Sequence, residues 1–240
     1  MDKKEFIEKL KKRSELLKID IEIEEFEKFY DYMKLLIEWN EKINLTAITD
    51  PNEIILKHFI DSITINKYIK NNSKLLDIGT GAGFPGLPEK IIRKDIYVTL
   101  ADSLNKRIKF LNQVISNLNL EKIEAIHGRA EELSQNKFYR ENFDVVVSRA
   151  VAPLNVLLEY MLPFCKLGGF CISMKGSNIE DEIINSKKAL QILGGEILEI
   201  DKFELPNSDI KRNIIIIKKI KETPKNYPRK SGTPSKEPIS

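Results

Sequence analysis

The chain has 240 residues, of which 42% are hydrophobic and 31% are charged, and its formal net charge is +3. This composition is typical of a globular protein, and no apolar stretch approaches the about 20 residues that cross a bilayer. The charged start of the chain does not have the pattern of a signal peptide, so we expect a cytoplasmic protein without a membrane partner.

Residues 1–70 have a helical pattern and no convincing strand. Between Phe26 and Ile37, apolar residues recur at steps of three and four, which predicts an amphipathic helix that ends near Trp39-Asn40. A second helical pattern follows Asp50, which can cap it, and Pro51, which suits a first helical turn.

From residue 74 onward, strand-like runs alternate with helical patterns. Strands are predicted at residues 74–78, 96–101, 123–127, 143–148, 169–174, 196–204 and 213–217. Helices are predicted at about 86–93, 103–119, 153–164 and 178–193. Because the strands are apolar rather than alternating, they indicate a parallel sheet that is covered on both faces.

The last two predicted strands are an exception to the parallel arrangement. About eight residues around Pro206 separate them, too few for a helical crossover, so they should pair antiparallel. The run Ile214–Ile217 predicts a strand buried on both faces. We therefore predict an α/β fold of the class I S-adenosylmethionine-dependent methyltransferase type: a Rossmann-like, seven-stranded sheet with an antiparallel terminal hairpin and an N-terminal helical extension.

The predicted domains are a helical extension at 1–70, a methyltransferase domain at 71–221 and a basic, Pro-rich tail at 222–240. From residue 218 to the end, seven basic residues stand against two acidic ones, so this segment carries +5 and residues 1–217 carry −2. On charge alone a solvated, disordered tail is favoured, and a tail that binds a polyanionic partner is the alternative.

The glycine-rich segment Leu75–Gly86 joins an apolar strand to a helical pattern. Glycine is needed there if the turn has positive φ, or if backbone approaches a ligand closely. Gly79 directly follows the strand, and Gly81 follows in a G-x-G-x-G spacing, so we predict that both contact a cofactor. A G-x-G-x-x-G pattern begins only at Gly81, which leaves a nicotinamide or flavin site as an alternative.

Three further positions follow predicted strands. Asp102 can accept the hydroxyl hydrogens of a ribose, or it can cap the next helix, although Ser103 could cap equally well. Ala130 and Glu131 lie where an adenine is expected, and an ordinary helix start is the alternative. Arg149 suits a carboxylate, a phosphate or a stacked base, and an ion pair with a neighbouring carboxylate is the alternative.

The histidines and cysteines give weaker signals. His58 is interpreted as a packed or capping residue, and Cys165 and Cys171 as buried thiols rather than a disulfide. Their spacing lacks the pattern of a metal cluster, so we predict no metal.

Taken together, these residues resemble the bacterial small-subunit ribosomal RNA methyltransferase G family, also called glucose-inhibited division protein B, over nearly the whole chain. The matching segments are Trp39-Asn40 with Asn44–Thr46, His58 with Asp61-Ser62, Gly79–Gly86, Asp102-Ser103 with Lys106-Arg107, Gly128–Glu131, Ser148–Ala150 and Tyr227–Pro234. Glu89 departs from the apolar or basic residue usual in the family, and we expect it on a helix surface.

The resemblance implies S-adenosylmethionine as the methyl donor and N7 of one guanine in 16S ribosomal RNA as the acceptor, with the RNA or the small ribosomal subunit as partner. It implies cofactor contacts from Gly79, Phe84, Ala130, Glu131 and Arg149. Because guanine N7 carries a lone pair and no proton, we assign no catalytic acid or base.

We expect the RNA to contact Arg149, at the border of the cofactor and acceptor sites, and the tail residues Lys225, Arg229 and Lys230. The target guanine is expected to stack on an aromatic side chain such as Phe84. A non-enzymatic ribosome-binding or assembly factor and a small-molecule methyltransferase with the same fold are the alternative functions.

Overall fold

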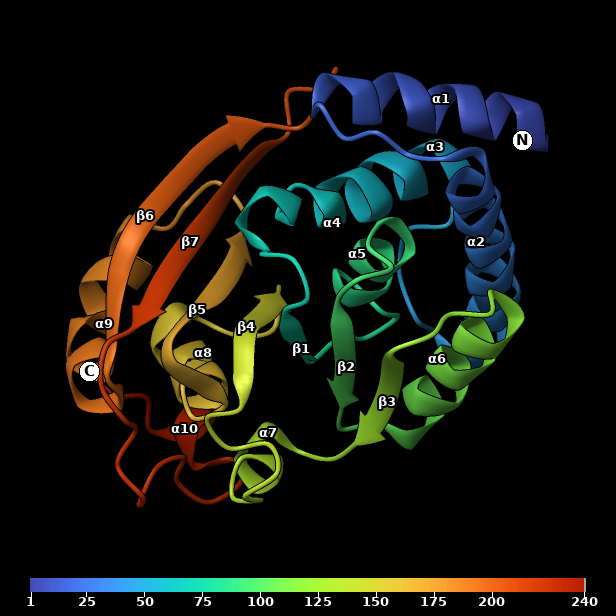
Figure 1. Cartoon of the computed structure of the whole chain (residues 1–240). Coiled ribbons are helices and arrows are strands. Elements are labelled where there is room, and N and C mark those ends of the chain that lie inside the picture. The colour runs from blue at the N-terminus through green and yellow to red at the C-terminus, as the bar shows by residue number, and fades with distance from the viewer. Residues whose placement is uncertain (240) are drawn as a thin grey trace.

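The computed structural model describes residues 1–239, and across them the chain forms a seven-stranded sheet flanked by helices (Figure 1). The strands are β1 (Lys74–Ile78), β2 (Tyr97–Asp102), β3 (Ile123–His127), β4 (Phe143–Arg149), β5 (Cys165–Lys175), β6 (Gly195–Glu204) and β7 (Lys211–Lys219). The α-helices are α1 (Lys3–Leu16), α2 (Ile23–Ile43), α3 (Pro51–Glu53), α4 (Asp61–Ile63), α5 (Gly86–Ile92), α6 (Asn105–Asn117), α7 (Ala130–Leu133), α8 (Leu154–Met161), α9 (Glu180–Leu193) and α10 (Thr233–Lys236). A π-helical segment, Ile54–Ile60, joins α3 to α4, and a 3₁₀ turn spans Asn66–Tyr68.

The strand order is β3-β2-β1-β4-β5-β7-β6. The strands from β3 to β5 pair parallel, whereas β7 is antiparallel to both β5 and β6, which confirms the predicted terminal hairpin. Since β2 and β4 flank β1 on opposite sides, the order of the strands reverses there. A parallel sheet opens a crevice at the carboxyl ends of its strands at such a point.

The sheet has an apolar core on each face. On β7, Ile214 and Ile216 belong to one hydrophobic cluster, and Ile215 and Ile217 belong to the other. This confirms that the strand is buried on both faces, as alternate side chains must point to opposite sides. The first cluster contains residues of α1, α2, α5 and α6, and the second contains residues of α8 and α9.

Both helical patterns predicted in the N-terminal extension are present, but the second is largely a π-helical segment, which was not predicted. The helix predicted to end near Asn40 continues to Ile43 and stops where Asn44 has a left-handed conformation. As predicted, Asp50 caps the next helix by accepting the N–H groups of two following residues, and Pro51 occupies its first turn.

The strand ends also differ. β5 begins at Cys165, four residues before the predicted start, because an irregular register at the start of β4 lets Cys165 pair with Phe143. Cys165 and Cys171 are free and buried, as predicted. Within residues 1–239, none of the helices combines the length and the apolar character needed to traverse a bilayer. No cluster of His, Cys, Asp and Glu among these residues could hold a metal ion.

Residues 222–239 fold against the body of the protein, whereas charge alone favoured a disordered tail. Arg140 donates to main-chain carbonyl groups of this segment, including that of Tyr227 at 3.0 Å. Pro234 and Ile239 are buried. Contacts of this kind offset the entropy lost on ordering, and a count of charged residues does not register them.

Glu89 was expected on a helix surface, and this is wrong. The side chain is 0% exposed, and neither of its carboxylate oxygens has a hydrogen-bond partner. Burial raises its pKa well above the ordinary value, because the low-dielectric interior disfavours the charged form. The physical reason is tertiary: α2 and α4 pack on α5 and cover this position.

Candidate functional site

A cavity of about 690 Å³ opens where β1 and β4 end, and a second of about 160 Å³ adjoins it. The two share the lining residues Gly79, Asp102, Ser103 and Val151. The larger one falls within the about 300–1,000 Å³ typical of small-molecule sites. Its lining combines the ends of four strands with residues of the N-terminal extension, from Leu45 to Asp61.

The loop after β1 forms one wall of the larger cavity. Gly79, Gly81 and Gly83 have φ of +68°, +61° and +102°, which confirms the predicted need for positive φ. A Cβ at Gly79 would lie 2.6 Å from Cγ2 of Val151, so this backbone has no room for a side chain. Gly81, which has no side chain within 4 Å of its Cβ position, presents bare main chain to the cavity.

Asp77 stabilises this loop through hydrogen bonds to its carboxylate. Its Oδ2 accepts from the Thr80 hydroxyl at 2.7 Å and from the Gly86 N–H at 2.9 Å. The side chain is 0% exposed, and burial raises its pKa to about 6. This carboxyl group thus ties the start of the loop to the start of α5.

Asp102 joins three elements at the end of β2. Its Oδ1 accepts from the Leu104 N–H at 2.9 Å, and its Oδ2 accepts from the Gly81 N–H at 3.0 Å and from Arg107 Nη1 at 3.1 Å. Asp102 therefore binds the main chain just before α6, and Leu104, the N-cap of that helix, gives it no side-chain cap; the cap expected from Asp102 or Ser103 is absent. Asp102 lines both cavities as well, so its contacts with Leu104, Gly81 and Arg107 do not remove it from the site.

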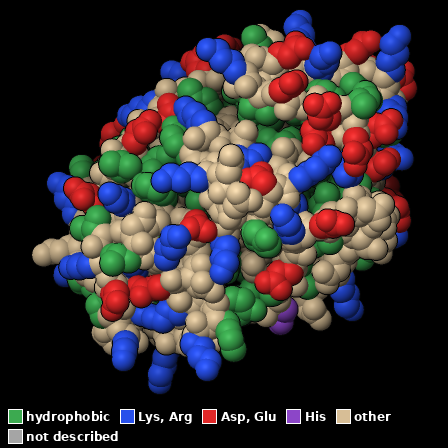
Figure 2. Space-filling model, viewed as in Figure 1, with side chains coloured by type: hydrophobic (Ala, Val, Ile, Leu, Met, Phe, Trp, Pro, Cys, Tyr) green, Lys and Arg blue, Asp and Glu red, His purple; other side chains and the backbone are tan. Residues whose placement is uncertain are grey.

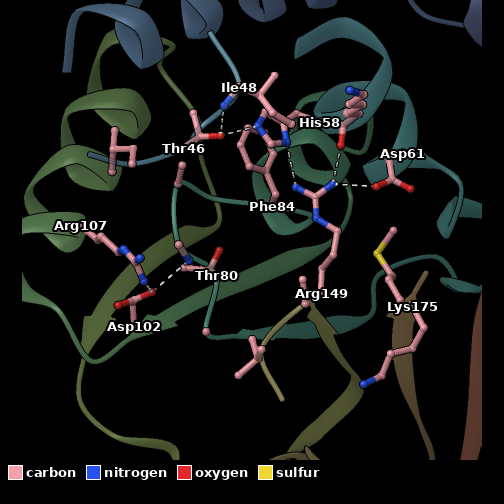
Figure 3. A pocket seen from close by; sticks show the side chains of 18 of the residues that line it. Thr46, Ile48, His58, Asp61, Thr80, Phe84, Asp102, Arg107, Arg149 and Lys175 are labelled. Atoms are coloured by element: carbon pink, nitrogen blue, oxygen red, sulfur yellow. Dashed lines mark hydrogen bonds and ion pairs between the residues drawn. The ribbon is translucent and has the colours of Figure 1, made fainter. Parts of the chain in front are cut away.

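Arg149 lies at the end of β4 in a closely bonded cluster (Figure 3). Its Nη1 donates to the Lys57 carbonyl at 3.1 Å and to Asp61 Oδ2 at 3.2 Å. Its guanidinium carbon lies 5.0 Å from the centre of the Phe84 ring. The ion pair considered for Arg149 is thus present, and it fixes the guanidinium at the cavity wall.

His58 supports the same cluster. Its Nδ1 lies 3.3 Å from Arg149 Nη2 and therefore accepts, so Nε2 carries the proton and donates to the Thr46 hydroxyl at 2.9 Å. Burial, together with the charge of Arg149, lowers the His58 pKa to about 3. The imidazole is consequently neutral, in keeping with the packed role predicted for it.

Phe84 is not available as a stacking platform. The His58 ring stacks on it at 4.4 Å, the Tyr32 ring stacks with it at 5.5 Å, and 6% of the residue is exposed. The expected guanine stack needs an open ring face, which this packing does not provide. The sequence could not show this because the covering rings come from α2 and the π-helical segment.

Ala130 and Glu131 line the smaller cavity together with Gly128 and Tyr160. The carboxylate of Glu131 also contacts the tail, because its Oε1 accepts a hydrogen bond from the Gly232 N–H at 2.9 Å. The short helix α7 also starts at Ala130, so the ordinary helix start considered from the sequence coexists with a position at the cavity.

The three basic residues assigned to the tail lie outside both cavity linings. Lys225 and Lys230 are exposed. Arg229 differs, because its Nη2 lies 2.7 Å from Oε2 of Glu159, a carboxylate that is 1% exposed. Its guanidinium is therefore committed to the fold.

The sequence did not identify two residues of the site, Asp61 and Arg212, as functional positions. Asp61 bridges two cations: its Oδ2 meets Arg149, and its Oδ1 accepts from Arg212 Nε at 3.0 Å. Asp61 did stand in a segment that carried the family resemblance. Arg212 had no local signal, because only the pairing of β7 with β5 brings it to this edge of the sheet.

The sequence of this chain is similar to that of a known protein family over most of its length. A family model described as rRNA small subunit methyltransferase G matches residues 25–215. A ribosomal RNA small subunit methyltransferase G from Acetivibrio thermocellus is 57% identical over 223 residues, which cover 92% of each chain. The protein of the same name from Clostridium beijerinckii is 51% identical over 98% of this chain and 99% of its own.

Solved structures share the fold at low sequence identity. A SAM-dependent methyltransferase from Aquifex aeolicus matches with a TM-score of 0.53 at 15% identity, over 72% of this chain and 96% of its own. The M. jannaschii TYW2 structure in complex with AdoMet has a TM-score of 0.52 at 16% identity, over 67% and 77% of the two chains. These neighbours confirm the predicted fold class.

Proposed function

This chain belongs to the rRNA small subunit methyltransferase G family, and from that premise we propose that it methylates N7 of one guanine in 16S ribosomal RNA. It is a methyltransferase that uses S-adenosylmethionine as its methyl donor. The observation that carries the proposal is the pair of joined cavities, with bare glycine backbone and Asp102 at the junction and Arg149 on the wall of the larger one.

The residues present fit an adenosyl ligand. Gly81 has φ +61° and no side chain within 4 Å of its Cβ position, so a ligand can lie against this backbone, whereas Val151 packs against Gly79. Asp102 offers a nearly buried carboxylate to the ribose hydroxyls, and Ala130 and Glu131 border the adenine in the smaller cavity. When bound, the cofactor supplies an electrophilic methyl group on a positively charged sulfur.

The side chains of the larger cavity position the reactants and do not transfer protons. Asp61 is committed to two guanidinium groups, and His58 is neutral with a partner on each ring nitrogen. Guanine N7 needs no base, because it attacks with a lone pair and carries no proton. Holding it in line with the methyl group supplies the acceleration through effective concentration.

Arg149 would hold the guanine and the cofactor at adjacent positions. Its guanidinium is already oriented by Asp61, the Lys57 carbonyl and His58, so little side-chain entropy is lost on binding (Figure 3). A planar cation of this kind suits a carboxylate or a base edge that accepts hydrogen bonds.

The surrounding parts of the chain take supporting roles in this proposal. Residues 71–221 form the methyltransferase unit, and the extension at 1–70 completes the larger cavity, where the guanine would bind, with residues such as Thr46 and His58. The exposed Lys225 and Lys230 contact RNA phosphates electrostatically. The protein would act in the cytoplasm, where ribosomal RNA is found.

Methyl transfer to defined substrates tests the proposal. Purified protein with radiolabelled donor is offered naked 16S RNA, assembled small subunits lacking the modification, and a small-molecule guanosine. We expect label on one guanine of the RNA, located at N7 by chemical cleavage, and at least a hundredfold loss of rate in Arg149→Ala. Label on another atom would contradict the assignment of N7, and binding to subunits without any transfer would favour the assembly factor.

A further inference from the structure

The carboxyl-terminal segment reaches the smaller cavity. We call residues Tyr227–Lys236 the C-terminal strap; it lies beside α7 and α8 (Figure 1). Glu131, on α7, is 7% exposed and lines that cavity, and the strap holds its carboxylate.

Two anchors fix the path of the strap. At its start, Arg140 donates to the Tyr227 carbonyl at 3.0 Å. Two residues later, Glu159 accepts from the Arg229 N–H at 2.7 Å and pairs with its guanidinium. Because Glu159 is 1% exposed, this pair is shielded from solvent and is expensive to break. The strap is therefore part of the folded body.

Beyond these anchors the strap turns at Gly232 and meets α7. The Gly232 N–H donates to Glu131 Oε1 at 2.9 Å, and the Ser231 hydroxyl donates to Glu132 Oε1 at 3.0 Å. Gly232 has φ +85°, and no atom lies within 4 Å of the position of a Cβ. Glycine is thus required here by the backbone turn that aims the N–H at Glu131.

We propose that the Gly232 N–H is a positioning group for the cofactor site: it holds the Glu131 carboxylate so that the free oxygen can accept the 6-amino group of an adenine. The inference rests on the proposed function, because it takes the smaller cavity as the adenine end of the site. A carboxylate held by a main-chain donor has fewer rotamers to lose on binding, so the strap sets cofactor affinity and selectivity for the adenine base.

A pair of matched glycine variants tests this. Gly232→Val forces a β-branched residue to positive φ and displaces the N–H. Gly168→Val is the control, because Gly168 also has positive φ (+79°) and open space around its Cβ position. It lies near the start of β5, whereas the cavity is at the end of that strand. Calorimetry measures the affinity of each protein for S-adenosylhomocysteine and for the analogue in which hydrogen replaces the 6-amino group.

We expect Gly232→Val to lose about tenfold in affinity for S-adenosylhomocysteine, because one charge-assisted hydrogen bond is lost. The loss should be less than twofold for the analogue with hydrogen in place of the 6-amino group. Gly168→Val should change neither value, although both variants should melt at a lower temperature. Glu131→Ala should reproduce the lost selectivity, and combining it with Gly232→Val should cause no further loss, since both act through one carboxylate.

Three outcomes would overturn the inference. They are unchanged selectivity in Gly232→Val, an equal loss for both ligands, or a Glu131→Ala variant that still prefers the amino-bearing ligand. If Gly232→Val does not fold, Gly232→Ala takes its place, because alanine also disfavours the positive φ and adds only a methyl group where the structure has open space. Absence of binding by the unaltered protein would instead reject the proposed cofactor site itself, so the two failures are distinguishable.

Discussion

At Gly79 a single hydrogen in place of a side chain decides the shape of the cofactor loop. The residue combines φ +68° with a Cβ position 2.6 Å from Val151 Cγ2, so both backbone and space forbid substitution. Asp77, two residues earlier, supplies the other half of the arrangement by binding Thr80 and Gly86. One position keeps the loop open to a ligand, and the other holds it in place.

The first residue-scale prediction concerns Gly79→Val. The new side chain would strain the backbone and force Val151 away, so the junction of the two cavities should close. We expect at least a hundredfold loss of affinity for S-adenosylhomocysteine by calorimetry, whereas Gly168→Val should bind normally. Tight binding by Gly79→Val would show that the ligand does not approach this backbone.

The second residue-scale prediction concerns pH. The folded-state pKa of Asp77 is about 6 and its ordinary value is 3.8, so the folded chain binds more protons than the unfolded chain between these values. The free energy of unfolding contributed by this group therefore falls as pH rises from about 4 to about 6. A shift of about two pKa units corresponds to about 3 kcal/mol.

Asp77→Asn has no proton to lose and should remove that decline. Urea unfolding at several pH values between 4 and 7 measures it, with circular dichroism as the probe. A variant whose stability changes with pH in parallel with the unaltered protein would show that another group titrates in this range.

At the scale of elements, the N-terminal extension builds part of the site. Helix α2 contributes Tyr32, whose hydroxyl donates to the Ala82 carbonyl in the glycine loop and whose ring stacks with Phe84. The π-helical segment contributes His58, which stacks on the same phenyl ring. Two segments from outside the sheet thus hold the loop that the sheet positions.

Tyr32→Phe tests this coupling, because it keeps the ring and removes the hydroxyl. The buried Ala82 carbonyl loses a donor, so we expect a loss of about 1–3 kcal/mol in the free energy of unfolding and a severalfold weaker binding of S-adenosylhomocysteine. Tyr30→Phe, on the same helix, is the control, since Tyr30 is only half-buried. Equal effects of the two substitutions would contradict a specific role for Tyr32.

At the scale of the whole molecule, basic and acidic side chains are mixed over most of the face in view, and several basic ones gather along its lower edge (Figure 2). The net charge of +3 arises from the carboxyl-terminal region. Within that region the structure separates exposed lysines from Arg229, which is paired with a buried carboxylate. Positive charge alone therefore does not identify the RNA contacts.

The salt dependence of RNA binding separates these roles. If the protein neutralises about four phosphates, the logarithm of affinity should fall with the logarithm of salt at a slope of about −3. Lys225→Ala and Lys230→Ala should each reduce the slope by about 0.7 without changing stability. Arg229→Ala should instead lower the free energy of unfolding by about 3 kcal/mol, because the buried Glu159 would lose its guanidinium partner and keep only the main-chain N–H of residue 229. Filter binding and urea unfolding distinguish the two classes, and a stable Arg229→Ala with a reduced slope would reverse the assignment.

Much of the fold could be predicted because its signals are local. Apolar strands alternating with helical patterns indicated the covered sheet, and the short connection around Pro206 indicated the hairpin that β6 and β7 form. The turn at Gly79 was predictable for a similar reason, since a tight turn restricts residue type at the position itself. Element ends were less predictable, because register irregularities such as the one that extends β5 depend on a partner strand.

The sequence by itself determined the sheet, the glycine loop, the strand ends that border the cavities and the family resemblance, because each depends on residue types over a few neighbouring positions. Only the tertiary structure decided that Glu89 is buried, that Phe84 is covered by His58 and Tyr32, that Asp61 joins Arg149 to Arg212, and that the tail holds Glu131. Those features depend on which distant segments pack together, and packing is a property of the complete fold rather than of any one segment.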